Sequence, residues 1–170
     1  MHEPLRSQLT KKQRRQLPSL ARLLLRRLEE DFPAEPFQAA IEPVPYGGGV
    51  EDKLVVRLHS AHPHVPALWF ILFQPDEITA HWGRPWHWHI VGDFAWRKKG
   101  IPVADAERQT MDKAIQFVRD VLGDRAVVCL DQGGRSGVYL LPQHENALRD
   151  CNKQSSEFYV WSGPCDRSQL

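Results

Sequence analysis

Two histidines separated by one residue, His87 and His89, are the side chains of this sequence best suited to chemistry. In an extended strand they would lie on one face about 7 Å apart, so both imidazoles could reach a single Zn²⁺ or Fe²⁺. A catalytic metal site needs a third protein ligand, which His81 or Asp93 could supply. One hypothesis is therefore a small metal-dependent enzyme with His81, His87 and His89 as metal ligands. The simpler interpretation is that these histidines occupy polar positions of a sheet.

Tryptophan is concentrated around these histidines. The chain has six tryptophans in 170 residues, and four of them fall within a stretch of fifteen: Trp82, Trp86, Trp88 and Trp96. Rigid, amphipathic indoles next to arginine are favoured at the centres of protein interfaces, whereas burial in the core is the simpler role for most of them. We predict a partner-binding surface made of Trp82, Arg84, Trp86, His87 and His89, with Arg97 and Lys98 as rim charges toward an acidic partner.

The rest of the sequence carries no pattern typical of an active site. Cys129, Ser136 and Ser162 lack a nucleophile motif such as G-x-S-x-G. The glycine-rich segment Gln132–Gly137 precedes a strand, whereas a phosphate-binding loop should open a helix. We therefore predict no catalytic residue and no cofactor.

Charge is nearly balanced over the chain as a whole but not along it. The 22 basic and 21 acidic side chains give a net charge of +1, which excludes a strong overall field for nucleic acid or an anionic membrane. Residues 1–27 nevertheless hold eight Lys and Arg against one acid, Glu3, and so carry +7. We expect a basic N-terminal arm over residues 1–17 and a single globular α+β body over residues 18–170. No recognition-helix or RNA-binding motif follows the cluster Lys11–Arg15, so nucleic acid is not the expected partner.

Targeting and membrane signals are not evident in the sequence. The chain starts without an apolar run of signal-peptide length, and its longest apolar stretch, Val65–Phe73, is too short to cross a bilayer. Three cysteines without a C-x-x-C pair are typical of reduced thiols in a reducing compartment, and a bridge between Cys151 and Cys165 is the alternative. We expect a cytoplasmic protein that does not bind membranes.

The periodicity of apolar residues predicts the elements that position these side chains. One helix is expected over Pro18–Phe32, and a second carries the stripe from Met111 to Leu122, with Gly123 as its C-terminal cap. Residues 33–49 should contain turns and at most one short edge strand. Strands are expected at Lys53–Leu58, Ala67–Phe73, Glu77–Trp82, Trp86–Val91, Ala126–Leu130, Val138–Leu141 and Glu157–Trp161. This order predicts an α+β fold, in which an antiparallel sheet of about five to seven strands packs two main helices on one face.

The segment EITAHWGRPWHWHI, Glu77–Ile90, resembles a recurring feature of bacterial immunity proteins of polymorphic-toxin systems. In these small cytoplasmic α+β proteins, a strand of the type E-I-T-V precedes a short turn and an aromatic-His-x-His strand. The matching residues are Glu77, Ile78, Thr79, Trp86, His87 and His89, with Ala80 in place of the usual valine.

The resemblance implies a protein that binds and neutralises a toxin made by the same cell and that performs no catalysis of its own. Such an inhibitor needs about 800 Å² of complementary surface with a few aromatic or arginine anchors. Two alternatives stay open: the metal-dependent enzyme, and a chaperone-like or adaptor-like α+β domain that binds a partner segment as a homodimer.

Overall fold

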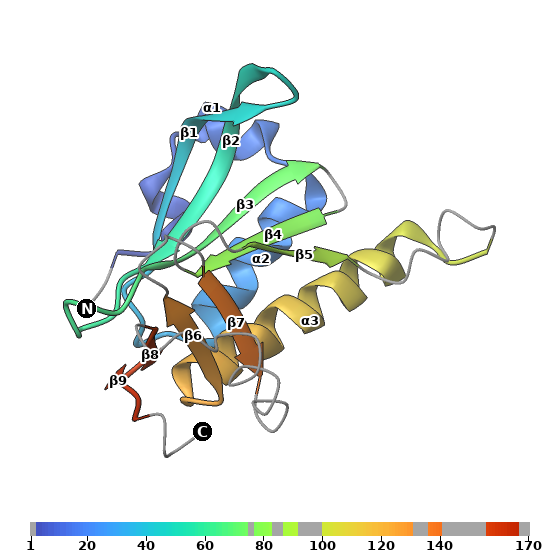
Figure 1. Ribbon diagram of the computed structural model, residues 1–170. Helices are drawn as coiled ribbons and strands as arrows, with labels where there is room; N and C mark the ends of the chain where they lie inside the picture. The colour runs from blue at the N-terminus through green and yellow to red at the C-terminus, as the bar shows by residue number, and fades with distance from the viewer. Residues whose placement is uncertain are drawn as a thin grey trace. The chain divides into compact units, whose positions relative to one another are not determined.

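The computed structural model describes residues 3–74, 77–82, 87–91, 100–130, 136–140 and 156–166. In this part of the chain the α+β fold is confirmed, with three α-helices, a five-stranded antiparallel sheet and a second sheet of four strands (Figure 1). The chain divides into two compact units. Unit 1 comprises Met1–Leu58, Trp69–Ala80 and His89–Ile115, and unit 2 comprises His59–Leu68, His81–Trp88 and Gln116–Leu170.

The elements follow one another along the chain as helices, one sheet, a long helix and a second sheet. The helical elements are η1 (Leu5–Gln8), α1 (Lys11–Gln16), α2 (Ser19–Asp31) and α3 (Val103–Leu122). The first sheet has the order β1-β2-β3-β4-β5, with β1 (Gln38–Tyr46), β2 (Gly49–Leu58), β3 (Leu68–Gln74), β4 (Glu77–Trp82) and β5 (His87–Val91). The second has the order β7-β6-β8-β9, with β6 (Ala126–Leu130), β7 (Ser136–Leu140), β8 (Glu157–Val160) and β9 (Gly163–Pro164).

Residues 3–17, which belong to the basic arm expected over residues 1–17, contain η1 and α1 and are packed at three leucines. Leu5 and Leu9 are each only 3% exposed, and Leu17 is buried as well. The lysines and arginines between them lie on the outside. Three leucines so far apart form no recognisable stripe in the sequence, and their burial comes from the turns that η1 and α1 introduce.

Hydrogen bonds tie this segment to the first sheet. The side-chain nitrogen of Gln8 donates to the Phe37 carbonyl oxygen at 3.2 Å, and its side-chain oxygen accepts from the Ala39 N–H at 2.8 Å. At the start of α1, Thr10 and Gln13 form a reciprocal capping box. The box satisfies two N–H groups that would otherwise lack partners, which stabilises a helix of only six residues.

Helix α2 confirms the predicted helix at Pro18–Phe32. Pro18 is its N-cap, and the Phe32 N–H donates to the Leu28 carbonyl oxygen at 3.1 Å at its end. The buried stripe consists of Leu20, Ala21, Leu24, Leu25 and Leu28. No acidic residue lies in the first turn and no basic residue in the last, so packing of this stripe, and not the helix dipole, stabilises the helix.

The β1–β2 hairpin is longer than the sequence predicts. Residues 33–49, expected to contain at most a short edge strand, supply the nine-residue strand β1, whose register with β2 runs from Gln38 opposite Arg57 to Tyr46 opposite Gly49. Pro43 and Pro45 lie within β1. Because β1 is an outer strand of the sheet, only the N–H groups on one of its edges need to bond to a neighbouring strand. Pro43 and Pro45 are two residues apart, so both lack an N–H on the same edge, and the N–H groups of the other edge remain available for β2.

Strand β3 is the central strand of the first sheet, as its sequence predicts. It has two neighbours on each side in the strand order, and Leu68, Phe70, Ile71 and Leu72 are all buried. Consecutive buried residues show that both faces of this strand are covered. Strand β4 has the predicted bounds, Glu77–Trp82.

Helix α3 buries the predicted stripe but ends differently from the expectation. Met111, Ala114 and Val118 are fully buried. The residue with a left-handed backbone at the helix end is Asp124, with a φ of 55°, and not Gly123. Neither α3 nor any other helix in the described part of the chain is long and apolar enough to cross a membrane.

The second sheet has its own small core. Val127, Cys129 and Phe158 are buried against one another, with Tyr139 and Val160 packed beside them. Cys129 is disulfide-bonded, which differs from the expected set of three reduced thiols. Cys165 is not part of a disulfide, and its thiol donates to the Asp166 carbonyl oxygen at 3.7 Å.

Candidate functional site

Strand β5 presents three consecutive side chains to solvent. His87 and His89 are exposed, and Trp88 between them is 36% exposed. The next residue, Ile90, is buried and anchors the strand. Alternation alone would expose every second side chain, so exposure of three in a row identifies a strand whose two faces are both partly open. Its position as the last strand in the order of the sheet explains this exposure.

Trp88 is held in place although it is partly exposed. Its ring packs edge-on against Phe117 of α3, with 5.3 Å between the ring centroids and an interplanar angle of 74°. Aromatic pairs favour this geometry. The contact restricts the rotamers of Trp88, so less side-chain entropy remains to be lost when a partner covers the indole.

A carboxylate on the neighbouring strand orients His89. Nδ1 of His89 is in hydrogen-bond contact with Oε1 of Glu77, and the Thr79 hydroxyl donates to the same oxygen at 3.1 Å. Glu77 is mostly buried, with 17% of its side chain exposed, against 55% for His89. The carboxylate therefore fixes the direction of an exposed imidazole, an arrangement that can serve recognition or proton transfer.

Glu77 and Thr79 are absent from the predicted site residues, although both belong to the segment that resembles immunity proteins. Their separation by one residue on β4 places them on one face of that strand. The sequence does contain a clue to their role. The E-x-T pattern lies on the predicted strand that directly precedes the strand with the two histidines, and side chains on adjacent strands can contact each other.

The described residues do not assemble the alternative metal site. The rings of His81 and His87 lie 5.7 Å apart, with an angle of 34° between their planes. Among the residues that the structure describes, no three His, Cys, Asp or Glu side chains are grouped so that they could hold a metal ion. His89 contacts the carboxylate of Glu77.

Trp82 belongs to the core and not to the predicted partner-binding surface. Its side chain is fully buried, and its indole nitrogen donates to the Pro66 carbonyl oxygen at 3.0 Å. The Trp161 ring lies 6.3 Å away. The remaining predicted residues of this surface, Arg84, Trp86, Arg97 and Lys98, lie outside the described residues.

The thiol of Cys165 is poorly suited to nucleophilic chemistry. Burial raises the pKa of this thiol, and the negative charges of Asp166 and Asp124 raise it further. A cysteine nucleophile requires the opposite shift, since the thiolate is the reactive form.

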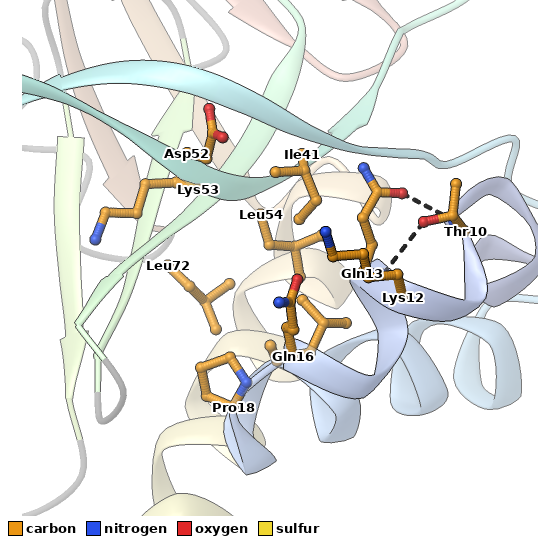
Figure 2. A pocket seen from close by; sticks show the side chains of 12 residues that line it. Thr10, Lys12, Gln13, Gln16, Pro18, Ile41, Asp52, Lys53, Leu54 and Leu72 are labelled. Carbon is orange, nitrogen blue, oxygen red and sulfur yellow. Dashed lines mark hydrogen bonds between the residues drawn. The ribbon is translucent and has the colours of Figure 1, made fainter.

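A groove of about 550 Å³ lies within unit 1, between α1 and the first sheet (Figure 2). Leu54 of β2 and Leu72 of β3 project into it toward Pro18, at the turn between α1 and α2. Gln16 and Lys12 lie along the α1 side. The Lys53 ammonium group is engaged elsewhere, 2.6 Å from Glu51 and 5.2 Å from the centre of the Tyr46 ring. Leu17, Leu54 and Leu72 give the groove a buried apolar floor, and Lys12 and Asp52 are among the residues that line it.

Comparison with known proteins adds no relative. No protein-family model, no curated protein and no solved structure matches the chain.

Proposed function

We propose that the chain is a protein-binding module that works as a cytoplasmic immunity protein, which binds and neutralises a cognate bacterial toxin. The observation that carries the proposal is the consecutive exposure of His87, Trp88 and His89 on an outer strand. This strand ends the segment that resembles immunity proteins.

Physical properties of β5 favour recognition of a protein. Trp88 supplies apolar area with a polar N–H, and its packing against Phe117 prepares it for contact. His89 is oriented by Glu77, so a hydrogen bond to a partner would cost little further ordering. A few such anchors at the centre of an interface supply most of its binding energy.

The proposal is tested by co-expression with a toxin encoded directly upstream of this gene. The wild-type chain should restore growth and form a complex with the toxin domain in calorimetry. A His87→Ala, Trp88→Ala, His89→Ala variant should bind at least about a hundredfold more weakly, since each anchor contributes roughly 1–2 kcal/mol.

The matched control is Val50→Ala, which changes an apolar side chain that is 68% exposed on the β1–β2 hairpin. It should bind as the wild type does, and circular dichroism should show native secondary structure for both variants. Growth arrest that persists with the wild-type chain, or unchanged affinity of the triple variant, contradicts the proposal.

A further inference from the structure

Four arginines surround one hollow in the N-terminal part of unit 1. The hollow has a volume of about 330 Å³. It is lined by Arg6, Arg14, Arg22 and Arg26, together with Leu17, Leu23, Leu25 and Ser19. These residues come from η1, α1 and α2 and the turns that join them. The packing of residues 5–17 therefore concentrates much of the basic N-terminal sequence around a single concave site.

Two of these arginines are held in defined positions. The Arg6 backbone N–H and its Nε each donate to the Glu29 carboxylate at 2.9 Å. A terminal guanidinium nitrogen of Arg14 donates to the Arg6 carbonyl oxygen, also at 2.9 Å. A ligand that binds between them would therefore meet guanidinium groups that are already partly ordered.

The charge at the hollow is only partly neutralised. Glu29 pairs with Arg6, and Glu30 lies 3.9 Å from Arg26. Arg14 has no carboxylate partner in the described residues, and Arg22 has neither an ion pair nor a side-chain hydrogen bond there. The guanidinium groups of Arg14 and Arg22 therefore have no carboxylate partner there, and Arg22 and Arg26 repel each other because they are four residues apart on α2.

We propose that this hollow, the arginine site, binds the dianionic phosphate group of a phosphate monoester. A phosphomonoester carries about −1.5 to −2 charges near neutral pH, which favours a site where two guanidinium groups have no carboxylate partner. The planar, forked donors of arginine fit phosphate oxygens in a bidentate manner. The Ser19 hydroxyl contacts Glu107 and is not counted as a ligand.

The lining favours a small monoester over a nucleic-acid backbone. A diester backbone presents one charge per phosphate along an extended track, whereas the four arginines face one concave site. Three leucines also line the hollow: Leu23 is half-buried, and Leu17 and Leu25 are buried. They can cover the apolar or aromatic group to which the phosphate is attached. The arginine site is independent of β5 and of the proposed toxin-binding role.

Isothermal titration calorimetry of the full chain tests the proposal with four probes: inorganic phosphate, phosphotyrosine, a nucleoside 5′-monophosphate and duplex DNA. At least one organic monoester should bind saturably and more tightly than inorganic phosphate, because only the organic monoesters contact the three leucines. If phosphotyrosine binds more tightly, the natural ligand is a phosphorylated side chain; if the nucleoside monophosphate binds more tightly, it is a nucleotide.

Arg14→Gln and Arg22→Gln should each weaken this binding about tenfold, as expected for the loss of one charge-assisted hydrogen bond. Arg15→Gln is the matched control, because it removes the same charge from α1 but does not line the hollow. It should change the affinity by less than about twofold at physiological salt, where distant charges are screened.

The Arg22 side chain is exposed and forms no hydrogen bond or ion pair within the described residues, so its variant stays interpretable even if Arg14→Gln proves unstable. Three results would overturn the proposal: no saturable binding of any monoester, equal weakening by Arg15→Gln and Arg22→Gln, or tighter binding of duplex DNA than of every monoester.

Discussion

The indole nitrogen of Trp82 donates a hydrogen bond to the carbonyl oxygen of Pro66 at 3.0 Å, inside unit 2. Trp82 is fully buried, so its indole nitrogen cannot exchange this bond for one with water. A tryptophan near an arginine in the sequence was expected to anchor an interface, but Trp82 lies in the core. A buried tryptophan also needs a polar partner, and here the backbone supplies it.

Trp82→Phe should destabilise the protein by roughly 2–4 kcal/mol, because it removes the donor for the Pro66 carbonyl and leaves a cavity. Trp88→Phe is the matched control: Trp88 is 36% exposed, and its aromatic contact with Phe117 can persist. That variant should lose less than about 1 kcal/mol. Urea unfolding followed by circular dichroism measures both losses, and equal losses would contradict the assignment of Trp82 to the core.

The ion pair between Glu42 and Arg57 should make stability depend on pH. The Arg57 guanidinium, which hydrogen-bonds to the carboxylate at 2.6 Å, lowers the pKa of Glu42 below its usual range. The stabilisation is therefore complete above the unfolded pKa of about 4.3 and is lost as the pH falls through the lowered folded pKa.

Glu42→Gln should lower the free energy of unfolding by roughly 0.5–1 kcal/mol at pH 7, a range suited to a partly exposed pair. The difference from the wild type should disappear at a pH below the folded pKa. Glu35→Gln is the control, since Glu35 forms no ion pair in the described part of the chain. A difference that stays constant across this pH range would contradict the electrostatic explanation.

The C-terminal end of α3 depends on an aspartate in a backbone conformation that glycine prefers. Asp124 has a φ of 55°, and its Oδ1 accepts a hydrogen bond from the Ser162 N–H at 3.0 Å. Asp124→Asn should be nearly neutral because asparagine tolerates this conformation and keeps the acceptor.

Asp124→Ala should lose roughly 1–2 kcal/mol, and Asp124→Gly should lose less because relief of strain offsets the missing hydrogen bond. Thermal unfolding of the three variants decides the order. If glycine and alanine are equally destabilising, backbone strain contributes nothing at this position.

The tautomer of His89 should report its contact with Glu77. A carboxylate accepts hydrogen bonds only, so Nδ1 of His89 carries the proton when it meets the ionised Glu77. Nitrogen NMR should show Nδ1 protonated in the wild type and a shift of the tautomer balance in Glu77→Ala. The exposed His87 ring, which lies 5.7 Å from the His81 ring, provides the internal control. An unchanged His89 tautomer would show that Glu77 does not orient it.

Apolar periodicity predicts the elements whose burial is one-sided or complete. The predicted ends of α2 and β3 agree with the observed ends to within one residue. Both predictions rest on an apolar stripe or a continuous apolar run, and such a pattern has few alternative packings. Strand β1 could not be predicted, since two prolines oppose a strand until its outer position is known.

The candidate site was only partly predictable for a related reason. Exposure of His87 and His89 follows from their polar alternation, but burial of Trp82 depends on residues distant in sequence, such as Pro66 and Trp161. The arginine site requires the turns around α1, which bring basic residues of three elements around one hollow. Local periodicity carries no information on such turns.

The N-terminal segment should contribute to global stability. Gln8→Ala removes the side chain that bonds to the Phe37 carbonyl oxygen and the Ala39 N–H, and it should destabilise the protein by roughly 1–3 kcal/mol. Gln16→Ala is the control, because Gln16 is exposed and makes no side-chain hydrogen bond within the described residues. Hydrogen exchange should show faster exchange at the Ala39 amide in Gln8→Ala only. An Ala39 amide that exchanges equally fast in the wild type would indicate that η1 is detached from β1 in solution.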